Sequence, residues 1–424
     1  MNANQLKKYI NDGALCAYAS IYSDIEAQKE RYLAAIDKFV SLFGGERDIY
    51  VLSVPGRSEL LGNHTDHNAG KVLAGAIDRD IIAVASPNTD GKVTLKSEGY
   101  PMDTIDLSVS GDPSGFADFT SAALIAGVAN GLSKNGYKVG GFDAYCTSDV
   151  LKGSGISSSA AYEVMIGNIF NHLYNDGKIE NTEIAKISQY AENVFFGKPS
   201  GLMDQMACAV GGFVYIDFEN AASPVIEPIS FSLRDAGYEL CIVNTGGNHA
   251  DLNDDYASVP AEMKAVAALF GKAQLRGLTE CDIVEKAAQI RATLGDRAFM
   301  RAIHFVREND RVECGKAALV RGDMSTFFNT VTASGTSSFK YLQNVYTVKN
   351  VGEQGLSLAL CLTDGLSAGA VGASRVHGGG FAGTIQAYVK SEHVDEYVRL
   401  MSAVFGEGAV MRLNVRPLGA IKVF

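Results

Sequence analysis

The feature that most constrains this chain is a glycine- and serine-rich stretch, residues 153–161, which reads Gly-Ser-Gly-Ile-Ser-Ser-Ser-Ala-Ala. Before it, apolar and polar side chains alternate over residues 142–147, as in a half-buried strand. After it, apolar residues recur at helical spacing over residues 164–173, and Asn175 supplies a helix end. The sequence therefore predicts a strand–loop–helix unit with the serines at the start of the helix.

The start of such a helix is suited to an anion. Unpaired backbone N–H groups and the positive end of the helix dipole meet there. Glycines let the backbone approach a ligand closely, and serine hydroxyls can reach a phosphate or its magnesium ion. The loop is not a Walker A loop, because no Gly-Lys-Ser/Thr follows the glycines. The alternative is an ordinary Gly/Ser turn with good helix caps.

Charge and composition exclude several classes of protein. The chain has 424 residues and a net charge of −11, which argues against a nucleic-acid or anionic-membrane partner. No apolar run approaches the ~20 residues that span a bilayer, and the first residues do not resemble a signal peptide. Seven scattered cysteines without Cys-x-x-Cys pairs predict reduced thiols in a cytoplasmic protein.

A polar segment, residues 55–70, follows the apolar strand-like run at residues 49–54. It carries arginine, asparagine, histidine and aspartate side chains between two apolar runs, which indicates a pocket for a hydroxyl-rich ligand. His64, Asp66 and His67 could instead ligate a metal ion. That alternative is weaker, because a metal site usually needs three or four protein ligands and no partner cluster follows.

Two short motifs occur later in the chain. Residues 201–205, Gly-Leu-Met-Asp-Gln, follow a Pro/Gly turn, and Asp204 opens a short helix, where aspartate is usually only a cap. Residues 378–383, Gly-Gly-Gly-Phe-Ala-Gly, precede a strand-like run. The second half of the chain then alternates strands and helices, which suggests an α+β sheet lobe.

Taken together, four segments resemble the galactokinase family of the GHMP small-molecule kinase superfamily. Residues 55–66 resemble its sugar signature, and residues 153–161 resemble its phosphate loop. Residues 201–205 resemble its catalytic segment, and residues 378–383 resemble its third glycine motif. One such motif is a weak signal, but four in the family's order and spacing are specific.

The resemblance implies an α+β, two-lobed GHMP kinase fold with mixed sheets flanked by helices and an active site in the cleft between the lobes. We expect one lobe at residues 1–215 and the other at residues 216–424. The implied activity is an ATP-dependent sugar-1-kinase that converts galactose and ATP into galactose 1-phosphate and ADP. The implied protein acts on small molecules, without nucleic acid or membrane, as a monomer or weak homo-oligomer.

The resemblance also implies catalytic roles. Asp204 matches the catalytic aspartate that accepts the proton of the sugar's C1 hydroxyl, and Arg57 matches the arginine that keeps it ionised. Because the arginine makes the aspartate a weak base, we expect positioning and charge stabilisation to matter more than proton abstraction. Ser159 and Glu192 match the ligands of Mg²⁺, with Ser158 as an alternative to Ser159.

Binding residues follow from the same matches. The positions expected to line the path of ATP are Gly153, Ser154, Gly155, Ser157, Ser158, Gly379 and Gly380. The positions expected to contact the sugar are Asn63, His64, Asp66, Gly201 and Tyr256.

The chain departs from the family pattern at two sugar-site positions. Asn63 replaces a glutamate that binds the sugar's 6-hydroxyl, and His67 replaces a tyrosine, as in the related galacturonokinases. Asparagine would tolerate a C6 carboxylate that glutamate would repel. Galacturonate, N-acetylgalactosamine and arabinose therefore remain alternative substrates to galactose.

A non-catalytic sugar sensor is the alternative from another class. Some fungal galactose sensors resemble galactokinase but lack residues of the serine loop. Here residues 159–161 are complete, and Arg57, Glu192 and Asp204 are all present. The sequence therefore favours an enzyme over a sensor.

Overall fold

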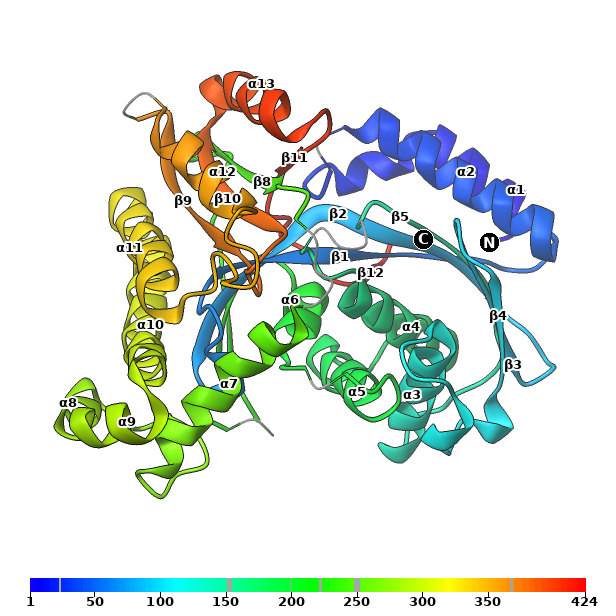
Figure 1. Ribbon diagram of the computed structural model, residues 1–424. Coiled ribbons are helices and arrows are strands. Elements are labelled where there is room, and N and C mark those ends of the chain that lie inside the picture. Colours follow the sequence, from blue (N-terminus) through cyan, green and yellow to red (C-terminus); the bar gives the residue numbers. More distant parts are fainter. Residues whose placement is uncertain (23, 151–154, 199, 221–222, 248–251, 367–368) are drawn as a thin grey trace.

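Two β-sheets organise the chain, as Figure 1 shows. The computed structural model describes residues 1–22, 24–150, 155–198, 200–220, 223–247, 252–366 and 369–424. Six strands of the larger, eight-stranded sheet follow the order β12-β1-β2-β5-β3-β4. The other two branch from β2: β6 pairs with β2, and β7 pairs with β6. The strands of this sheet are β1 (Tyr50–Leu61), β2 (Lys71–Pro87), β3 (Lys92–Ser97), β4 (Met102–Asp106), β5 (Phe142–Ser148), β6 (Phe213–Asp217), β7 (Val225–Ile229) and β12 (Ile421–Lys422).

Helices cover both faces of the larger sheet (Figure 1). One face carries α1 (Ala3–Asn11) and α2 (Ile25–Phe43). The other carries α3 (Ser121–Lys134), α4 (Ser158–Tyr174), α5 (Asn181–Val194) and α6 (Met203–Val210). Neighbouring residues of β1 serve different faces, because side chains alternate along a strand: Val51 packs in the core under α1 and α2, and Leu52 packs in the core under α4. This double covering buries β1 almost throughout.

The smaller sheet has four strands in the order β11-β8-β10-β9. They are β8 (Tyr238–Asn244), β9 (Val371–His377), β10 (Thr384–Lys390) and β11 (Val410–Leu413). The helices around and beyond it are α7 (Asn253–Ala268), α8 (Glu280–Glu285), α9 (Ala287–Leu294), α10 (Asp296–Arg321), α11 (Met324–Ser337), α12 (Gly355–Asp364) and α13 (Val394–Phe405). None of the described helices is long and apolar enough to cross a bilayer.

The expected strand–loop–helix unit is present where the chain is described. Strand β5 precedes the loop, and α4 begins at Ser158, directly after Ser157 in the left-handed region at φ +62°. Gly155 also has a positive φ, +74°, which suits glycine. Gly153 and Ser154 of the predicted loop lie outside the described residues.

Residues 81–85 and 92–97 are consecutive strand-like runs with turn residues at 88–91 between them, a sequence typical of a hairpin, yet β2 and β3 do not pair. Strand β5 lies between them, antiparallel to β2 and parallel to β3. The buried, alternate residues of β5 pack in the same core as those of β2 and β3. With β5 between these strands, apolar surface is covered that a β2–β3 hairpin would leave exposed.

The division of the chain at residue 215 does not coincide with the division into sheets. Strands β7 and β12 follow that position but belong to the larger sheet. Strand β12 returns from the end of the described chain and pairs with β1, where Leu52 faces Lys422. The two lobes at residues 1–215 and 216–424 therefore remain a prediction about domains, and the sheets do not separate there.

Candidate active site

The four segments singled out in the sequence meet in space. The Arg57 side chain extends from β1, and its guanidinium donates to the Gly155 carbonyl at 2.5 Å. The His64 ring lies 2.9 Å from the Gly379 carbonyl, which joins the sugar signature to the third glycine motif. Asp204, in the first turn of α6, faces Arg57. The meeting point lies between the larger sheet's β1 and the turn that leads out of β9.

The Arg57–Asp204 pair is bidentate. Arg57 Nε and Nη2 donate to the two carboxylate oxygens, each at 2.7 Å, and the Ser157 hydroxyl donates to Oδ2 at 2.6 Å. A bulge in β1 between Pro55 and Arg57 aims the arginine toward the loop. Such fork-shaped, charge-assisted bonds fix both position and orientation.

The same contacts determine the charge on Asp204. Burial alone would raise its pKa, but attraction and hydrogen bonding from Arg57, with the hydrogen bond from Ser157, hold the pKa below its ordinary value. The side chain of Asp204 remains 27% exposed, compared with 9% for Arg57. An ionised carboxylate with one open side can therefore receive a ligand hydroxyl.

A second carboxylate, Glu192 of α5, lies deeper and is 2% exposed. Ser159 Oγ approaches its Oε1 at 3.3 Å, and Lys198 Nζ pairs with the same oxygen at 2.7 Å. Its Oε2 accepts from Ser200 Oγ at 2.5 Å and from Gln205 Nε2 at 2.7 Å. Two predicted cation ligands, Ser159 and Glu192, are thus in contact, while Ser158 stands at the start of the same helix.

Gln205 links Glu192 to a further buried carboxyl group, that of Glu163 in α4. Its Nε2 donates to Glu163 Oε2 at 3.0 Å as well as to Glu192. Burial, with the negative charge of Glu192 nearby, raises the pKa of Glu163 well above its ordinary range. Burial and repulsion from Glu192 thus disfavour a second negative charge at Glu163, and Lys198 contacts Glu192.

The predicted sugar-contacting residues line one end of this region. The Asp66 carboxylate lies so close to Gly201 that a side chain at position 201 would collide with it. Tyr256 of α7 donates from its hydroxyl to the Gly380 carbonyl at 2.8 Å, and its ring edge meets Gly379. These contacts bring Asp66, Gly201 and Tyr256 to the same part of the fold as the third glycine motif.

His64 adopts a left-handed conformation with φ +60°, which directs its ring toward the Gly379 carbonyl. Burial lowers its pKa to about 4, against the opposing effect of that hydrogen bond. The ring is therefore neutral at pH 7, and Nε2 donates to the carbonyl. His64 acts here as an uncharged hydrogen-bonding group.

Asn63 differs from what the sequence suggested. Its side chain is fully buried, and its amide uses every hydrogen bond it can make within the protein. Nδ2 donates to Glu59 Oε1 at 3.1 Å and to the Gly378 carbonyl at 2.7 Å. Oδ1 accepts from Asn344 at 2.8 Å and from Ser338 at 3.3 Å. In this structure Asn63 supports the glycine turn and offers no free polar atom to a sugar.

The described histidines do not come together as a metal centre. His377 is fully buried between the Ser58 and Thr384 hydroxyls, each 3.1 Å away, and burial lowers its pKa to about 3. His67 lies 3.6 Å from Asp66, and its ring centre is 6.2 Å from that of His64. Within the described ranges no group of three or more His, Cys, Asp or Glu side chains could hold a metal ion.

Comparison with known proteins agrees with this geometry. The galactokinase galactose-binding signature matches residues 37–87, and the GHMP kinase N-terminal domain matches residues 120–212. Galactokinase from Streptomyces coelicolor is 32% identical over 374 residues, which cover 87% of this chain and 92% of that protein. The chain belongs to the galactokinase family.

Other members of the galactokinase family show similar coverage. Galactokinase from Clostridium tetani is 28% identical over 86% of this chain and 90% of that protein. The crystal structure of Lactococcus lactis galactokinase with galactose has a TM-score of 0.77 at 24% identity, over 91% of this chain and 98% of that one. A mevalonate kinase structure has a TM-score of 0.60 at 15% identity, over 87% of this chain and 99% of that one. These likenesses confirm the GHMP kinase fold.

Membership of the galactokinase family confirms the predicted class of reaction. The chain is a phosphotransferase that acts on a sugar hydroxyl, with ATP as co-substrate. The sensor alternative is thereby disfavoured, as the sequence suggested.

Several residues of the site escaped the sequence analysis. Lys198, Ser200 and Gln205 all contact Glu192; the first two lie in the Pro/Gly turn that precedes Asp204, and Gln205 follows Asp204 in α6. Their proximity to that turn was the available signal. Asn344, which follows α11, gave no signal in the sequence, because its contact with Asn63 joins positions 281 residues apart.

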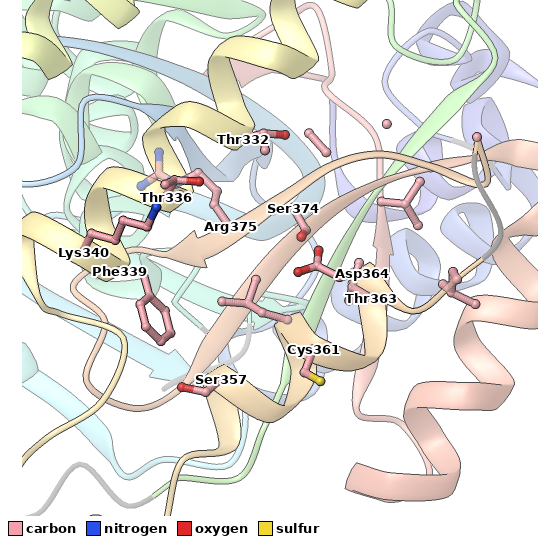
Figure 2. Close-up of a pocket in the computed structure, with 17 residues that line it drawn as sticks. Thr332, Thr336, Phe339, Lys340, Ser357, Cys361, Thr363, Asp364, Ser374 and Arg375 are labelled. Carbon is pink, nitrogen blue, oxygen red and sulfur yellow. The ribbon is translucent and has the colours of Figure 1, made fainter.

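The structure also contains a cavity away from this site, of about 710 Å³, between α11, α12 and β9 (Figure 2). Lys340 and Asp364 line it from different elements. None of the predicted site residues borders it. Arg375 is shared between the two regions, because it lines the cavity and its guanidinium reaches Glu59 at 2.8 Å, beside Asn63.

Proposed function

We propose that this chain is a galactose 1-kinase, which transfers the γ-phosphoryl group of ATP to the anomeric hydroxyl of α-D-galactose. The observation that carries the proposal is the bidentate Arg57–Asp204 pair, placed where the sugar signature, the serine loop and the third glycine motif meet. Family membership supports the same reaction.

The reaction requires one bond to form and one to break. The sugar's O1 forms a bond to the γ-phosphorus, and the bond from that phosphorus to the β,γ-bridging oxygen breaks, so that ADP leaves with the electron pair. Asp204 orients the O1 hydroxyl and accepts its proton. Because the pKa of Asp204 is lowered, the carboxylate is a weak base, and its larger contribution is to position the hydroxyl. Arg57 offsets negative charge that develops beside the carboxylate.

The start of α4 supplies the expected phosphate site. Backbone N–H groups of its first turn have no partner within the helix and are directed toward the loop. Gly155, Ser157 and Ser158 lie at this helix start, and Gly379 and Gly380 lie on the turn after β9. We propose that the triphosphate passes between the two.

The donor set at Glu192 and Ser159 fits Mg²⁺. A carboxylate and a hydroxyl are the hard oxygen ligands that this ion takes, and Glu192 already balances its buried charge with a cation, Lys198. When bound, Mg²⁺ neutralises charge on the phosphates during transfer. Ser159 and Glu192 would hold it, with Ser200 and Gln205 fixing the orientation of the carboxylate.

The sugar site rests on His64, Asp66, Gly201 and Tyr256. Asp66 can accept from sugar hydroxyls, and the lack of a side chain at Gly201 lets the Asp66 carboxylate lie against that backbone. His67 keeps galacturonate as a second candidate through its departure from the family pattern, whereas Asn63 also departs from that pattern but has no free polar atom for the sugar. We further propose a cytoplasmic monomer or weak homo-oligomer.

A coupled assay of ADP release with ATP and magnesium tests the proposal. The panel comprises galactose, galacturonate, N-acetylgalactosamine, arabinose and glucose. Turnover with galactose is expected, and turnover with galacturonate in its place would show a changed specificity, with His67 as its candidate determinant and Asn63 acting only through the glycine turn that it supports. If no sugar supports turnover while the protein still binds ATP, the kinase proposal fails and the sensor alternative returns.

A further inference from the structure

We propose that Lys198 is a tethered cation that competes with Mg²⁺ for Glu192 before nucleotide binds and contacts the transferred phosphoryl group afterwards. This inference rests on the proposed function, because it places the magnesium ion at Glu192. It assigns a task in the transfer to a residue that lies outside the four matched motifs.

The first step is the geometry of the ion pair. Lys198 Nζ lies 2.7 Å from Glu192 Oε1, the oxygen that Ser159 also approaches. The Glu192 side chain is 2% exposed and is fixed by Gln205, whereas the Lys198 side chain is 49% exposed. The carboxylate is therefore the fixed partner, and the lysine, on its flexible four-carbon stem, is the partner that can move.

The second step is charge. Among the residues that the structure describes, Lys198 is the cation paired with Glu192, and the other contacts of that carboxylate come from the neutral groups of Ser159, Ser200 and Gln205. A buried carboxylate without a cation is strongly unfavourable. Lys198 thus fills the electrostatic role of a metal ion when none is bound, and the two cations compete for the same oxygen.

The third step is the position of Lys198 relative to the reacting groups. Asp204 and Lys198 act on each other electrostatically, so the ammonium lies within the field of the catalytic carboxylate as well as beside Glu192. The same turn carries Gly201, which meets Asp66 of the sugar site. A cation between these carboxylates is near the path from ATP to the sugar hydroxyl.

Ser159 and Glu192 would hold Mg²⁺ together with ATP, and phosphate oxygens would then stand beside Lys198. The displaced ammonium can then donate to the γ-phosphoryl oxygens, which carry negative charge while O1 bonds to phosphorus and ADP departs with the electron pair. Lys198 keeps its proton throughout, since the hydroxyl proton goes to Asp204. The lysine contributes only charge and hydrogen bonds.

The test uses Lys198→Met, which keeps the length of the side chain without its charge, and Lys198→Arg, which keeps the charge. Lys186→Met is the matched control. Lys186 pairs with Glu183 at 3.9 Å, and both lie on α5, the helix that also carries Glu192. Binding of Mn²⁺, measured by electron paramagnetic resonance without nucleotide, reports the competition directly. We expect Lys198→Met to bind Mn²⁺ about tenfold more tightly than the wild type, and the control to be unchanged.

Kinetics with galactose report the second half of the proposal. We expect kcat of Lys198→Met to fall about a hundredfold with little change in KM for galactose, and Lys198→Arg to retain part of the rate. Unchanged Mn²⁺ affinity together with unchanged kcat in Lys198→Met overturns the inference. If Lys198→Met does not fold, Lys198→Arg provides the test. The proposal then requires that this variant bind Mn²⁺ no more tightly than the wild type and keep part of the wild-type kcat. Absence of ADP release by the wild type would instead reject the proposed function, and the Mn²⁺ titration would still decide the role of Lys198.

Discussion

Strand β1 carries two arginine–carboxylate pairs whose chemistry is alike and whose behaviour differs. Arg57 pairs with Asp204, and two residues later Glu59 pairs with Arg375 of β9 at 2.8 Å. In the first pair the pKa of the carboxyl is lowered. In the second, burial outweighs the attraction of Arg375 and Arg57 and raises the pKa of Glu59.

The difference follows from what else surrounds each pair. Asp204 keeps 27% of its side chain exposed, whereas Glu59 and Arg375 are 6% and 0% exposed. Arg375 also donates to the Leu60 carbonyl at 3.0 Å, so that its pair ties the larger sheet to the smaller one. The first pair holds a charge at a partly exposed position, and the second uses its charges to join two parts of the fold. The predictions below separate these roles.

Asp204→Asn should give the largest effect. The amide keeps the shape of the carboxylate but cannot accept the hydroxyl proton, so we expect kcat with galactose to fall by roughly 10³–10⁴-fold. Galactose affinity, measured by calorimetry, should change little. Equal turnover in variant and wild type would show that the Arg57–Asp204 pair is structural, like its counterpart.

Arg375→Met tests the second pair. Removing one partner leaves Glu59 buried without its cation, and we expect the free energy of unfolding to fall by about 3–4 kcal/mol. Urea denaturation measures it. Arg412→Met is the control, because Arg412 pairs with Glu239 and Asp395 at the surface and should cost no more than about 1 kcal/mol. Equal losses in the two variants would contradict the structural role of Arg375.

Glu308→Gln extends the comparison to a third buried carboxylate, whose contribution to stability should depend on pH. Burial alone would raise the pKa of Glu308, but Arg311, with other neighbours, lowers it to about 2, from an ordinary value of 4.5. A lowered folded-state pKa stabilises the protein fully above pH 4.5, and this contribution is lost as the pH falls toward 2. We expect the variant to lose about 3 kcal/mol at pH 7 and to approach the wild type in acid.

Urea unfolding of Glu308→Gln at pH 7, 5, 4 and 3 measures that trend. Glu227→Gln is the control, since Glu227 pairs with Lys316 at a half-exposed position. A constant difference between Glu308→Gln and the wild type across this range would show that the charge of Glu308 does not stabilise the fold.

Tyr256→Phe should give the smallest effect. It removes the hydrogen bond to the Gly380 carbonyl and keeps the ring against Phe381, at a centroid distance of 5.4 Å. We expect a loss of about 1 kcal/mol in sugar binding, seen as a roughly fivefold increase in KM for galactose, with kcat nearly constant. A fall in kcat without a change in KM would place Tyr256 with the reacting pair.

The contact between short motifs could be predicted from the sequence. Arg57 and Asp204 stand in segments whose resemblance to the family predicts that they meet, as they do, while their roles in catalysis stay a prediction. The bonds of Asn63 could not be predicted, because Asn344 and Gly378 lie some 280 and 315 positions away and no local pattern records such contacts. The position of β5 between β2 and β3 was hidden for the same reason, since periodicity indicates a strand but not its neighbours.

The pairing of β1 with β12 has a consequence for synthesis on the ribosome. Leu52 emerges early, but its partner Lys422 follows 370 positions later (422 − 52), which takes on the order of half a minute at ordinary elongation rates. Through that interval the outer edge of β1 has unpaired N–H and C=O groups next to apolar surface, a state that favours association with other chains. Arg416, which donates to Ser53 at 2.8 Å, arrives equally late. The nascent chain therefore depends on β12 and Arg416, or on a chaperone, to cover the strand that carries Arg57.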